Sequence, residues 1–289
     1  MKQISYLLEF IIVYILFFIF RLIPINFVSI IGGKLFQIVG PLSKSHQTAI
    51  ANFKKVFPKL NTKKVQTIIS KSWNNLGKTF IELIILNKLL NKKNKRIEIK
   101  GMEVINKIKK KNEQVIFFGI HQANWELLVP TLDKLEISVA AIYRHINNPY
   151  INRLILSIRT KTLHSKETVY TPKGKESAKE ILTAISKKKS IILLIDQKDN
   201  AGSDVKLFNY NVKTQIGFLK IAKKNNLKLI PVQTIREKIN NFKIIFHPHI
   251  NPFNNIRDDI DVMCDIHEII EKWIKENPDQ WLWQHKRFS

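Results

Sequence analysis

The sequence predicts an α/β protein in which one apolar N-terminal helix precedes a mostly parallel sheet flanked by helices. Two observations predict this class. The stretch "ISYLLEFIIVYILFFIF" at 4–20 carries a single charge, Glu9. Beyond residue 97, short apolar runs alternate with amphipathic stretches, which is typical of strands buried on both faces and separated by helices.

Residues 1–25 are predicted to be a membrane anchor. The 17 residues of 4–20 span roughly 25 Å as a helix, slightly less than the ~30 Å hydrocarbon core. Tyr6 and Arg21 stand near the two ends of this helix. A cleaved signal peptide is the alternative. The flank "RLIPINFVSIIGG" offers no small-x-small cleavage site, which favours an uncleaved, spanning or deeply inserted helix. The many lysines that follow place the body on the cytoplasmic side.

Residues 26–96 are predicted to form a helical, membrane-proximal segment. An apolar stretch at 23–39 is interrupted by Pro24 and by Gly32 and Gly33, and a long helical pattern covers 62–90. The lysine-rich "NKKNKR" at 91–96 indicates an exposed linker before the α/β core of residues 97–289.

Five β-like runs lie in that core, at 114–120, 137–143, 190–196, 227–233 and 242–248. In parallel sheets, ligands bind beyond the carboxyl ends of the strands. His121 follows the first run, and Asp196 and Asp199 follow the third, so these polar residues are candidates for a site.

Composition restricts the function less than the motifs do. The net charge of +25, from 40 lysines and 8 arginines against 23 acidic residues, predicts an anionic partner, either nucleic acid or an acidic membrane. Compositional drift toward Lys, Asn and Ile is a competing explanation. The lysines are spread throughout and the aromatic residues sit in apolar runs, which argues against nucleic acid. The lone Cys264 excludes an internal disulfide, and Walker, GxGxxG, GxSxG and HExxH motifs are absent.

The stretch "HQANWE" at 121–126 has two readings. If His121 lies on the strand-to-helix turn and Asn124 caps the helix, Glu126 reaches back to the imidazole. A carboxylate on one ring nitrogen fixes the tautomer and raises the basicity of the other, as a base for an alcohol requires. The other reading is a capping carboxylate beside a turn histidine.

A series of motifs in chain order favours the first reading. They are "ANFKKVFP" (51–58), "HQANWE" (121–126), "YRHINNPYINRLILSIR" (143–159), "IDQKDN" (195–200) and "NPDQWLWQHKRF" (277–288). Together with the N-terminal anchor, the set resembles the lipid A secondary (lauroyl/myristoyl) acyltransferases, within the His-x4-Asp/Glu glycerolipid-type acyltransferases. The sequence departs from that pattern at His145, at Lys286 and in "RTKTLHS", which lacks a frequent glycine; these departures concern substrate details.

The resemblance implies transfer of a fatty acyl group from acyl carrier protein to a hydroxyl of a lipid A precursor, at the cytoplasmic face of the inner membrane. His121 would be the general base and Glu126 its support, with no acyl-enzyme, no cofactor and no metal. The implied partners are the carrier protein, a glycolipid acceptor and the anionic membrane, and not nucleic acid.

The same resemblance implies roles for further residues. Arg159 would stabilise the oxyanion or grip an acceptor phosphate, with Arg144 as a second candidate. Asp196 and Asp199 would shape the site or pair with these arginines, and Asn52 would cap a helix or bridge backbone nearby. Each arginine is equally well explained as an exposed charge or a salt-bridge partner.

Several alternatives remain open at this point. The acceptor could instead be a lysophospholipid, an aminolipid or another glycolipid, and a basic nucleic-acid-binding protein is the reading from a different class. The closing "WLWQHKRF" suits either a membrane interface or one buried strand face, and His285 within it is expected to be structural.

Overall fold

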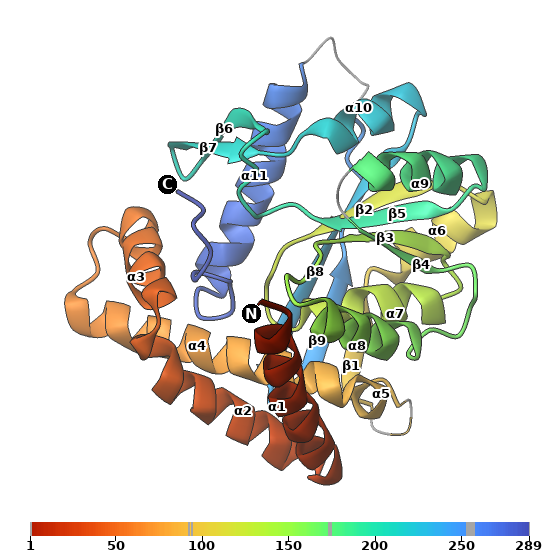
Figure 1. The fold of residues 1–289 in the computed structure, drawn as a ribbon. Helices are drawn as coiled ribbons and strands as arrows, with labels where there is room; N and C mark the ends of the chain where they lie inside the picture. The colour runs from red at the N-terminus through yellow and green to blue at the C-terminus, as the bar shows by residue number, and fades with distance from the viewer. Residues whose placement is uncertain (1, 92, 94, 173–174, 253–257, 289) are drawn as a thin grey trace.

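The computed structural model describes all residues except 1, 92, 94, 173–174, 253–257 and 289 (Figure 1). Its helices are α1 (Lys2–Leu22), α2 (Ile25–Val39), α3 (Lys44–Val56), α4 (Thr62–Ile84), α5 (Leu86–Leu89), α6 (Met102–Lys111), α7 (Leu128–Lys134), α8 (Pro149–Thr160), α9 (Lys175–Ser186), α10 (Gly217–Lys224) and α11 (Asp259–Glu276), with short 3-10 turns η1 (Gly40–Leu42) and η3 (Trp125–Leu127). The predicted linker 91–96 lies partly outside the described residues.

The strands form a seven-stranded sheet in the order β1-β9-β8-β2-β5-β3-β4 and a separate β6–β7 hairpin. They are β1 (Ile97–Lys100), β2 (Val115–Gly119), β3 (Val139–Tyr143), β4 (Val169–Pro172), β5 (Ser190–Leu194), β6 (Ser203–Leu207), β7 (Tyr210–Thr214), β8 (Lys228–Lys238) and β9 (Asn241–Phe246). All five predicted runs are strands, and within the large sheet only the β8–β9 pair is antiparallel. The predicted mostly parallel α/β fold is therefore confirmed.

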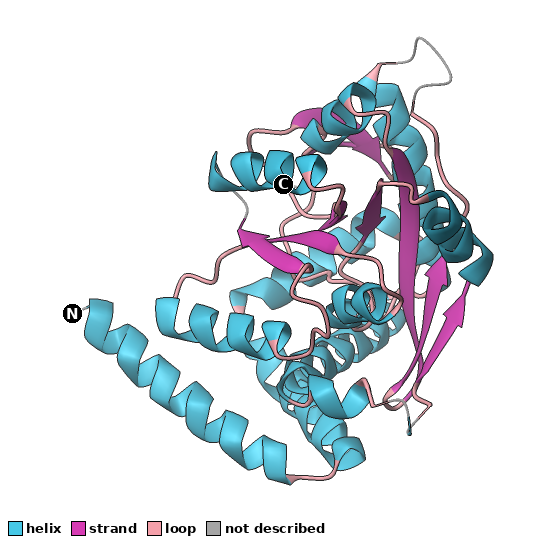
Figure 2. Cartoon of the chain, turned by 90° about the vertical axis from the view of Figure 1, so that its right-hand side faces the viewer, coloured by secondary structure: helices cyan, strands magenta, loops and turns pink. Residues whose placement is uncertain are grey.

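Helices cover both faces of this sheet (Figures 1 and 2). Successive side chains of a strand point to opposite faces, and on β2 Phe118 packs into a core with α4, α10 and α11, whereas Phe117 packs into a second core with α6 and α7. Because β2 is buried on both sides, it ends in the interior of the molecule and can hold a polar residue in a site shielded from water.

The glycines in α2 serve helix packing and do not interrupt the helix. α2 runs without a break from Ile25 to Val39, so Gly32 and Gly33 interrupt the apolar pattern but not the helix; Pro24 precedes the helix as its N-cap residue. A Cβ on Gly77 of α4 would lie 2.2 Å from the Gly32 carbonyl oxygen. Glycine is needed here because the two helix backbones approach each other closely.

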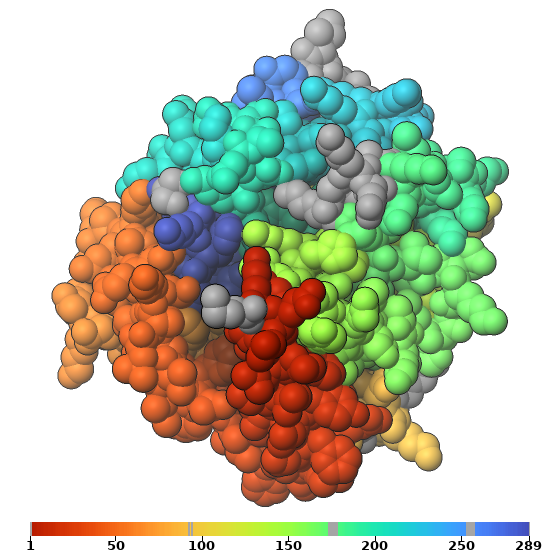
Figure 3. Space-filling view, in the orientation of Figure 1, coloured from red at the N-terminus to blue at the C-terminus, as the bar shows by residue number. Residues whose placement is uncertain are grey.

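The N-terminal helix contacts the body at both ends. Near its start, the amide of Asn148, the N-cap residue of α8, donates to the Tyr6 carbonyl (2.8 Å) and to Glu9 (3.0 Å), and near its end the Lys88 ammonium donates to the Arg21 carbonyl (2.8 Å). In Figure 3 the red start of α1 lies against the light-green surface of the segment that includes α8. The one carboxylate in the apolar helix thus serves to attach it to α8.

Two helical segments, Lys2–Leu22 and Ile25–Leu42, are long and apolar enough to cross a membrane by length and composition. Most of the exposed large apolar side chains among the described residues belong to these segments. Figure 2 shows α1, which starts at the N label, at the outer edge of the molecule, away from the sheet. The apolar surface of the protein is therefore concentrated on its N-terminal helices.

Candidate active site

His121 and Asp196 meet where two neighbouring parallel strands end. β2 and β5 pair up to Gly119 and Leu194, and the two polar residues each lie two positions further on. The Asp196 carboxylate lies 2.7 Å from Nδ1 of His121 and also accepts the His121 backbone N–H at 3.0 Å. Because Nδ1 faces this carboxylate, the tautomer that fits places its proton on Nδ1 and leaves Nε2 as a base.

Asp196 is held as an anion by its surroundings. Its second oxygen also accepts the indole N–H of Trp281 at 2.8 Å. Burial raises the pKa of the Asp196 carboxyl, but the His121 charge and the hydrogen bonds from His121 and Trp281 lower it more, so this pKa lies below its ordinary value. The carboxylate is thus able to orient the imidazole and to stabilise its protonated form.

Glu126 does not support His121, and this sequence-based expectation is wrong. Asn124 does cap the turn, since its side chain accepts the Glu126 backbone N–H. The Glu126 carboxylate, however, forms a two-pronged ion pair with Arg159 of α8, with distances of 2.8 Å and 2.6 Å. The cause is that η3 carries Glu126 toward α8, where a buried guanidinium is a stronger partner than an imidazole that already has Asp196.

Arg159 packs beside a pair of aromatic rings in addition to its carboxylate partner. Its guanidinium carbon is 5.8 Å from the ring centres of both Tyr143 and Tyr170. Burial lowers the pKa of Arg159, but the adjacent Glu126 raises it more, so the guanidinium stays charged. Burial and the Glu126 charge raise the pKa of Tyr170, so its hydroxyl stays protonated. Arg159, Glu126 and the two tyrosines together form part of the cavity wall, and the charge of Arg159 is paired with that of Glu126.

A cavity of about 880 Å³ opens at this edge of the sheet and contains His121, Glu126 and Arg159 in its lining. β3 and β5 stop pairing at Ala141 and Ile192, although β3 continues to Tyr143 and β5 to Leu194. The remaining ends of these two strands line the cavity.

The cavity is apolar in its depth and polar at its mouth. Its apolar wall includes Ile116, Leu128, Ile142, Ile181, Ile191, Leu193, Phe218 and Ile221, and its polar rim includes Arg144, Gln197, Lys198, Asp199 and Asn200. Such a space suits an apolar chain whose polar end stops beside His121.

The other predicted site residues fall at different distances from the cavity. Arg144 is exposed at its mouth, and Asp199 lies in the rim, where its carboxylate accepts the Ala201 N–H at 3.2 Å. Asn52 is not in the cavity lining. Its side-chain amide donates to the carbonyls of Trp283 (2.8 Å) and His285 (2.6 Å), so it bridges backbone as expected, but beneath the C-terminal segment.

The C-terminal segment supports the site from inside the molecule. Trp281 and Trp283 are only 2% and 0% exposed, so the membrane-interface reading of "WLWQHKRF" is wrong. The Leu282 N–H donates to the His121 carbonyl at 3.1 Å, and His285 Nε2 accepts the Lys198 N–H at 2.8 Å. The end of the chain therefore fixes both strand ends that carry the candidate dyad.

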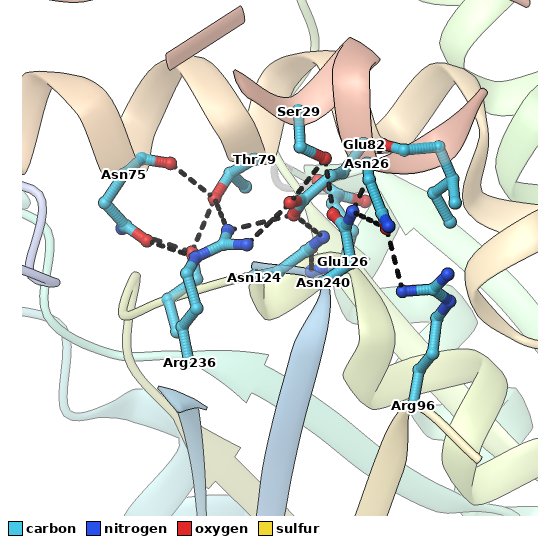
Figure 4. A network of polar contacts seen from close by, with 12 residues as sticks. Asn26, Ser29, Asn75, Thr79, Glu82, Arg96, Asn124, Glu126, Arg236 and Asn240 are labelled. Atoms are coloured by element: carbon cyan, nitrogen blue, oxygen red, sulfur yellow. Dashed lines mark hydrogen bonds and ion pairs between the residues drawn. The ribbon is translucent and has the colours of Figure 1, made fainter. Parts of the chain in front are cut away.

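A buried polar network holds the turn that follows His121 (Figure 4). Glu82 of α4 forms a two-pronged ion pair with Arg236 of β8, at 2.5 Å and 2.9 Å, and accepts the Asn124 amide at 2.8 Å. Thr79 donates to the carbonyl of Ala123, the residue with a left-handed φ of 51° in this turn. α4 thus stabilises a strained backbone conformation next to the site.

The same network extends to α2. The Ser29 hydroxyl contacts both Glu82 and Asn240. Sequence reasoning missed Glu82 and Arg236; the available signal was a lone carboxylate in the apolar stretch "TFIELII". In the part of the chain that the structure describes, no group of three or more His, Cys, Asp or Glu side chains is placed to hold a metal ion.

Comparison with known proteins gives consistent matches. The family model for bacterial lipid A biosynthesis acyltransferases matches residues 1–289. The lipid A biosynthesis palmitoleoyltransferase of Escherichia coli (strain K12) is 21% identical over 274 residues, covering 92% of this chain and 86% of that protein. The lipid A biosynthesis acyltransferase 2 of Shigella flexneri is 28% identical over 160 residues, covering 52% of this chain and 49% of that protein.

Among solved structures, the chain is similar to the 1-acyl-sn-glycerophosphate acyltransferase PlsC of Thermotoga maritima. The TM-score is 0.41 and the identity 13%, and the match covers 89% of this chain and 98% of that one.

His267, which is buried, and His285, which is half-buried, make the free energy of unfolding depend on pH. Burial lowers the pKa of His267 and of His285 to about 4, whereas unfolded histidines titrate near 6.5. The unfolded chain therefore binds more protons between these values, and we expect the free energy of unfolding to fall as the pH drops from about 6.5 to about 4. Chemical unfolding across this range measures the slope. The double variant His267→Gln/His285→Gln should have a shallower slope, and an unchanged slope would contradict the assignment.

Breaking the buried ion pair should be more harmful than removing it. Glu82→Gln leaves Arg236 buried without a charged partner, and we expect a loss of about 3–5 kcal/mol. In Glu82→Gln/Arg236→Gln no charge is left unpaired, so its loss should be smaller than the sum of the single losses. Denaturant unfolding of the wild type, Glu82→Gln, Arg236→Gln and the double variant measures this coupling, and strictly additive losses would show that the pair does not act as a unit.

Proposed function

The chain belongs to the bacterial lipid A biosynthesis acyltransferase family, and we propose that it moves a fatty acyl chain from acyl carrier protein to a hydroxyl of a lipid A precursor. One observation carries the proposal. His121 lines a cavity with an apolar depth and a polar rim, and Asp196 lies at its Nδ1, which leaves Nε2 as the basic nitrogen. This is the arrangement that a general base for an alcohol requires.

In the proposed reaction the acceptor hydroxyl binds at Nε2 of His121. The imidazole takes its proton while the oxygen attacks the thioester carbon, and the carbonyl π electrons move to the carbonyl oxygen. When this oxyanion collapses, the carbonyl re-forms and the bond to the carrier sulfur breaks. The thiolate that leaves is protonated by the imidazolium, so His121 returns to its neutral form. Asp196 stabilises the imidazolium throughout, no acyl-enzyme forms, and no cofactor takes part.

The apolar depth of the cavity fits the acyl chain of the donor, because its walls are aliphatic and aromatic side chains from β2, β5, α9 and α10. Arg144 at the mouth takes the role of gripping an anionic group of the acceptor, since Arg159 is already engaged by Glu126. Asp199 shapes the rim around this group.

We place the protein at the inner membrane, with α1 and the exposed face of α2 inserted and the α/β core on the cytoplasmic side. The net charge of +25 favours this side, an anionic leaflet and an acidic carrier protein. If α1 crosses the bilayer as a single pass, the contacts of Tyr6 and Glu9 with Asn148 have to open, because they hold the first half of α1 against α8.

The direct test is an acyl-transfer assay on membranes that contain the protein, with a panel of acyl-carrier-protein thioesters and with lipid A precursor or lysophospholipid as acceptor. Mass spectrometry of the lipids should detect a new ester on the lipid A precursor. His121→Ala should lower the rate by about 10²- to 10⁴-fold, which is the range for loss of a general base.

The matched control is His249→Ala, an exposed histidine outside the cavity lining, which should keep the wild-type rate. Full activity of His121→Ala would exclude the proposed base. Acylation of lysophospholipid alone would replace the proposed acceptor.

A further inference from the structure

The proposed reaction needs a hydrogen-bond donor for the oxyanion, and several of the nearby groups already have partners. The Nε and one terminal nitrogen of Arg159 donate to Glu126. After β5, the backbone N–H groups of Lys198 and Asp199 donate to His285 Nε2 and to the Lys213 carbonyl. These contacts leave room for a donor closer to Nε2 of His121, on another side chain of the cavity lining.

Gln197 is placed to be that donor. It directly follows Asp196 at the end of β5, is half-buried and lines the cavity. Its side-chain nitrogen lies 3.4 Å from Nε2 of His121, the ring nitrogen that Asp196 leaves free. The imidazole also packs edge-on against Trp125, whose ring centre is 5.0 Å away. The Gln197 amide therefore lies next to the ring nitrogen that the acceptor hydroxyl has to reach.

The length of this contact matters for its role. At 3.4 Å it is longer than the ~2.9–3.0 Å of an ordinary N–H hydrogen bond, so an incoming hydroxyl can displace it at little cost. The amide then keeps two N–H groups within a short distance of the attacking oxygen. The thioester carbonyl oxygen must lie close to that oxygen when the new bond forms.

We propose that the side-chain amide of Gln197 is a catalytic residue that donates a hydrogen bond to the oxyanion of the acyl-transfer step. The inference rests on the proposed function and adds a residue to its site. As the acceptor oxygen bonds to the thioester carbon, the negative charge that collects on the former carbonyl oxygen is stabilised by the amide N–H. The bond weakens again when the carbonyl re-forms and the thiolate leaves.

The test compares Gln197→Ala, Gln197→Glu and Gln197→His in steady-state assays with acyl-carrier-protein thioesters and lipid A precursor. Removing one oxyanion donor typically lowers kcat by about 10²- to 10³-fold. We expect this loss in the first two variants, with KM changed by less than about 3-fold because the bond forms only in the transition state. Gln197→His keeps an N–H donor and should recover part of kcat.

Three controls separate the possible causes. Asn211→Ala removes an exposed amide on β7, away from the cavity, and should keep wild-type kinetics. The unfolding temperature of the Gln197 variants should equal that of the wild type. In Gln197→Ala, which introduces no titrating group, the pH at which kcat/KM is half-maximal should also stay the same, whereas loss of a group that only orients His121 would move it.

Each outcome bears on one claim. If Gln197→Ala retains kcat within about 3-fold, raises KM alone or shifts the pH profile, the oxyanion role is overturned. If Gln197→His is as inactive as Gln197→Ala in a stable protein, the N–H donor is not what matters. If the wild type itself transfers no acyl group, the proposed function fails first, and this result is distinguishable from the others.

Discussion

The contact between Asp196 and His121 is the interaction on which the rest of the site depends. It joins the ends of two neighbouring parallel strands, so the sheet itself fixes the distance between carboxylate and imidazole. An anion at Nδ1 directs the basic nitrogen toward the cavity. Without this contact, the cavity and the apolar walls would hold an acyl chain but would offer no oriented base for an alcohol.

Much of the remaining structure keeps this pair shielded and correctly placed. Trp281 from the C-terminal segment donates to Asp196, and Asn52 of α3 holds the backbone of the same segment. On the other side, Glu82 of α4 holds the turn after His121 and is itself contacted from α2 by Ser29. The apolar N-terminal helices and the site are therefore connected by a short series of buried hydrogen bonds.

The sequence predicts the strands well because buried parallel strands are continuous apolar runs, and it identifies His121 and Asp196 because each follows such a run. It does not predict that they touch, since β3 lies between β2 and β5 in the chain but not in the sheet. The local pattern predicts that Glu126 contacts the nearest histidine, His121. Its partner in the structure is Arg159, which lies 33 residues further along the chain. Glu82 and Arg236 are 154 residues apart, and no local pattern joins them.

The tautomer of His121 is the most direct test of the central claim, and ¹⁵N NMR of the histidine-labelled protein at neutral pH measures it. The account predicts a proton on Nδ1 and an unprotonated Nε2, a state that is lost in Asp196→Asn and kept in Glu126→Gln. A proton on Nε2 in the wild type, or a signal that responds to Glu126→Gln and not to Asp196→Asn, would contradict it.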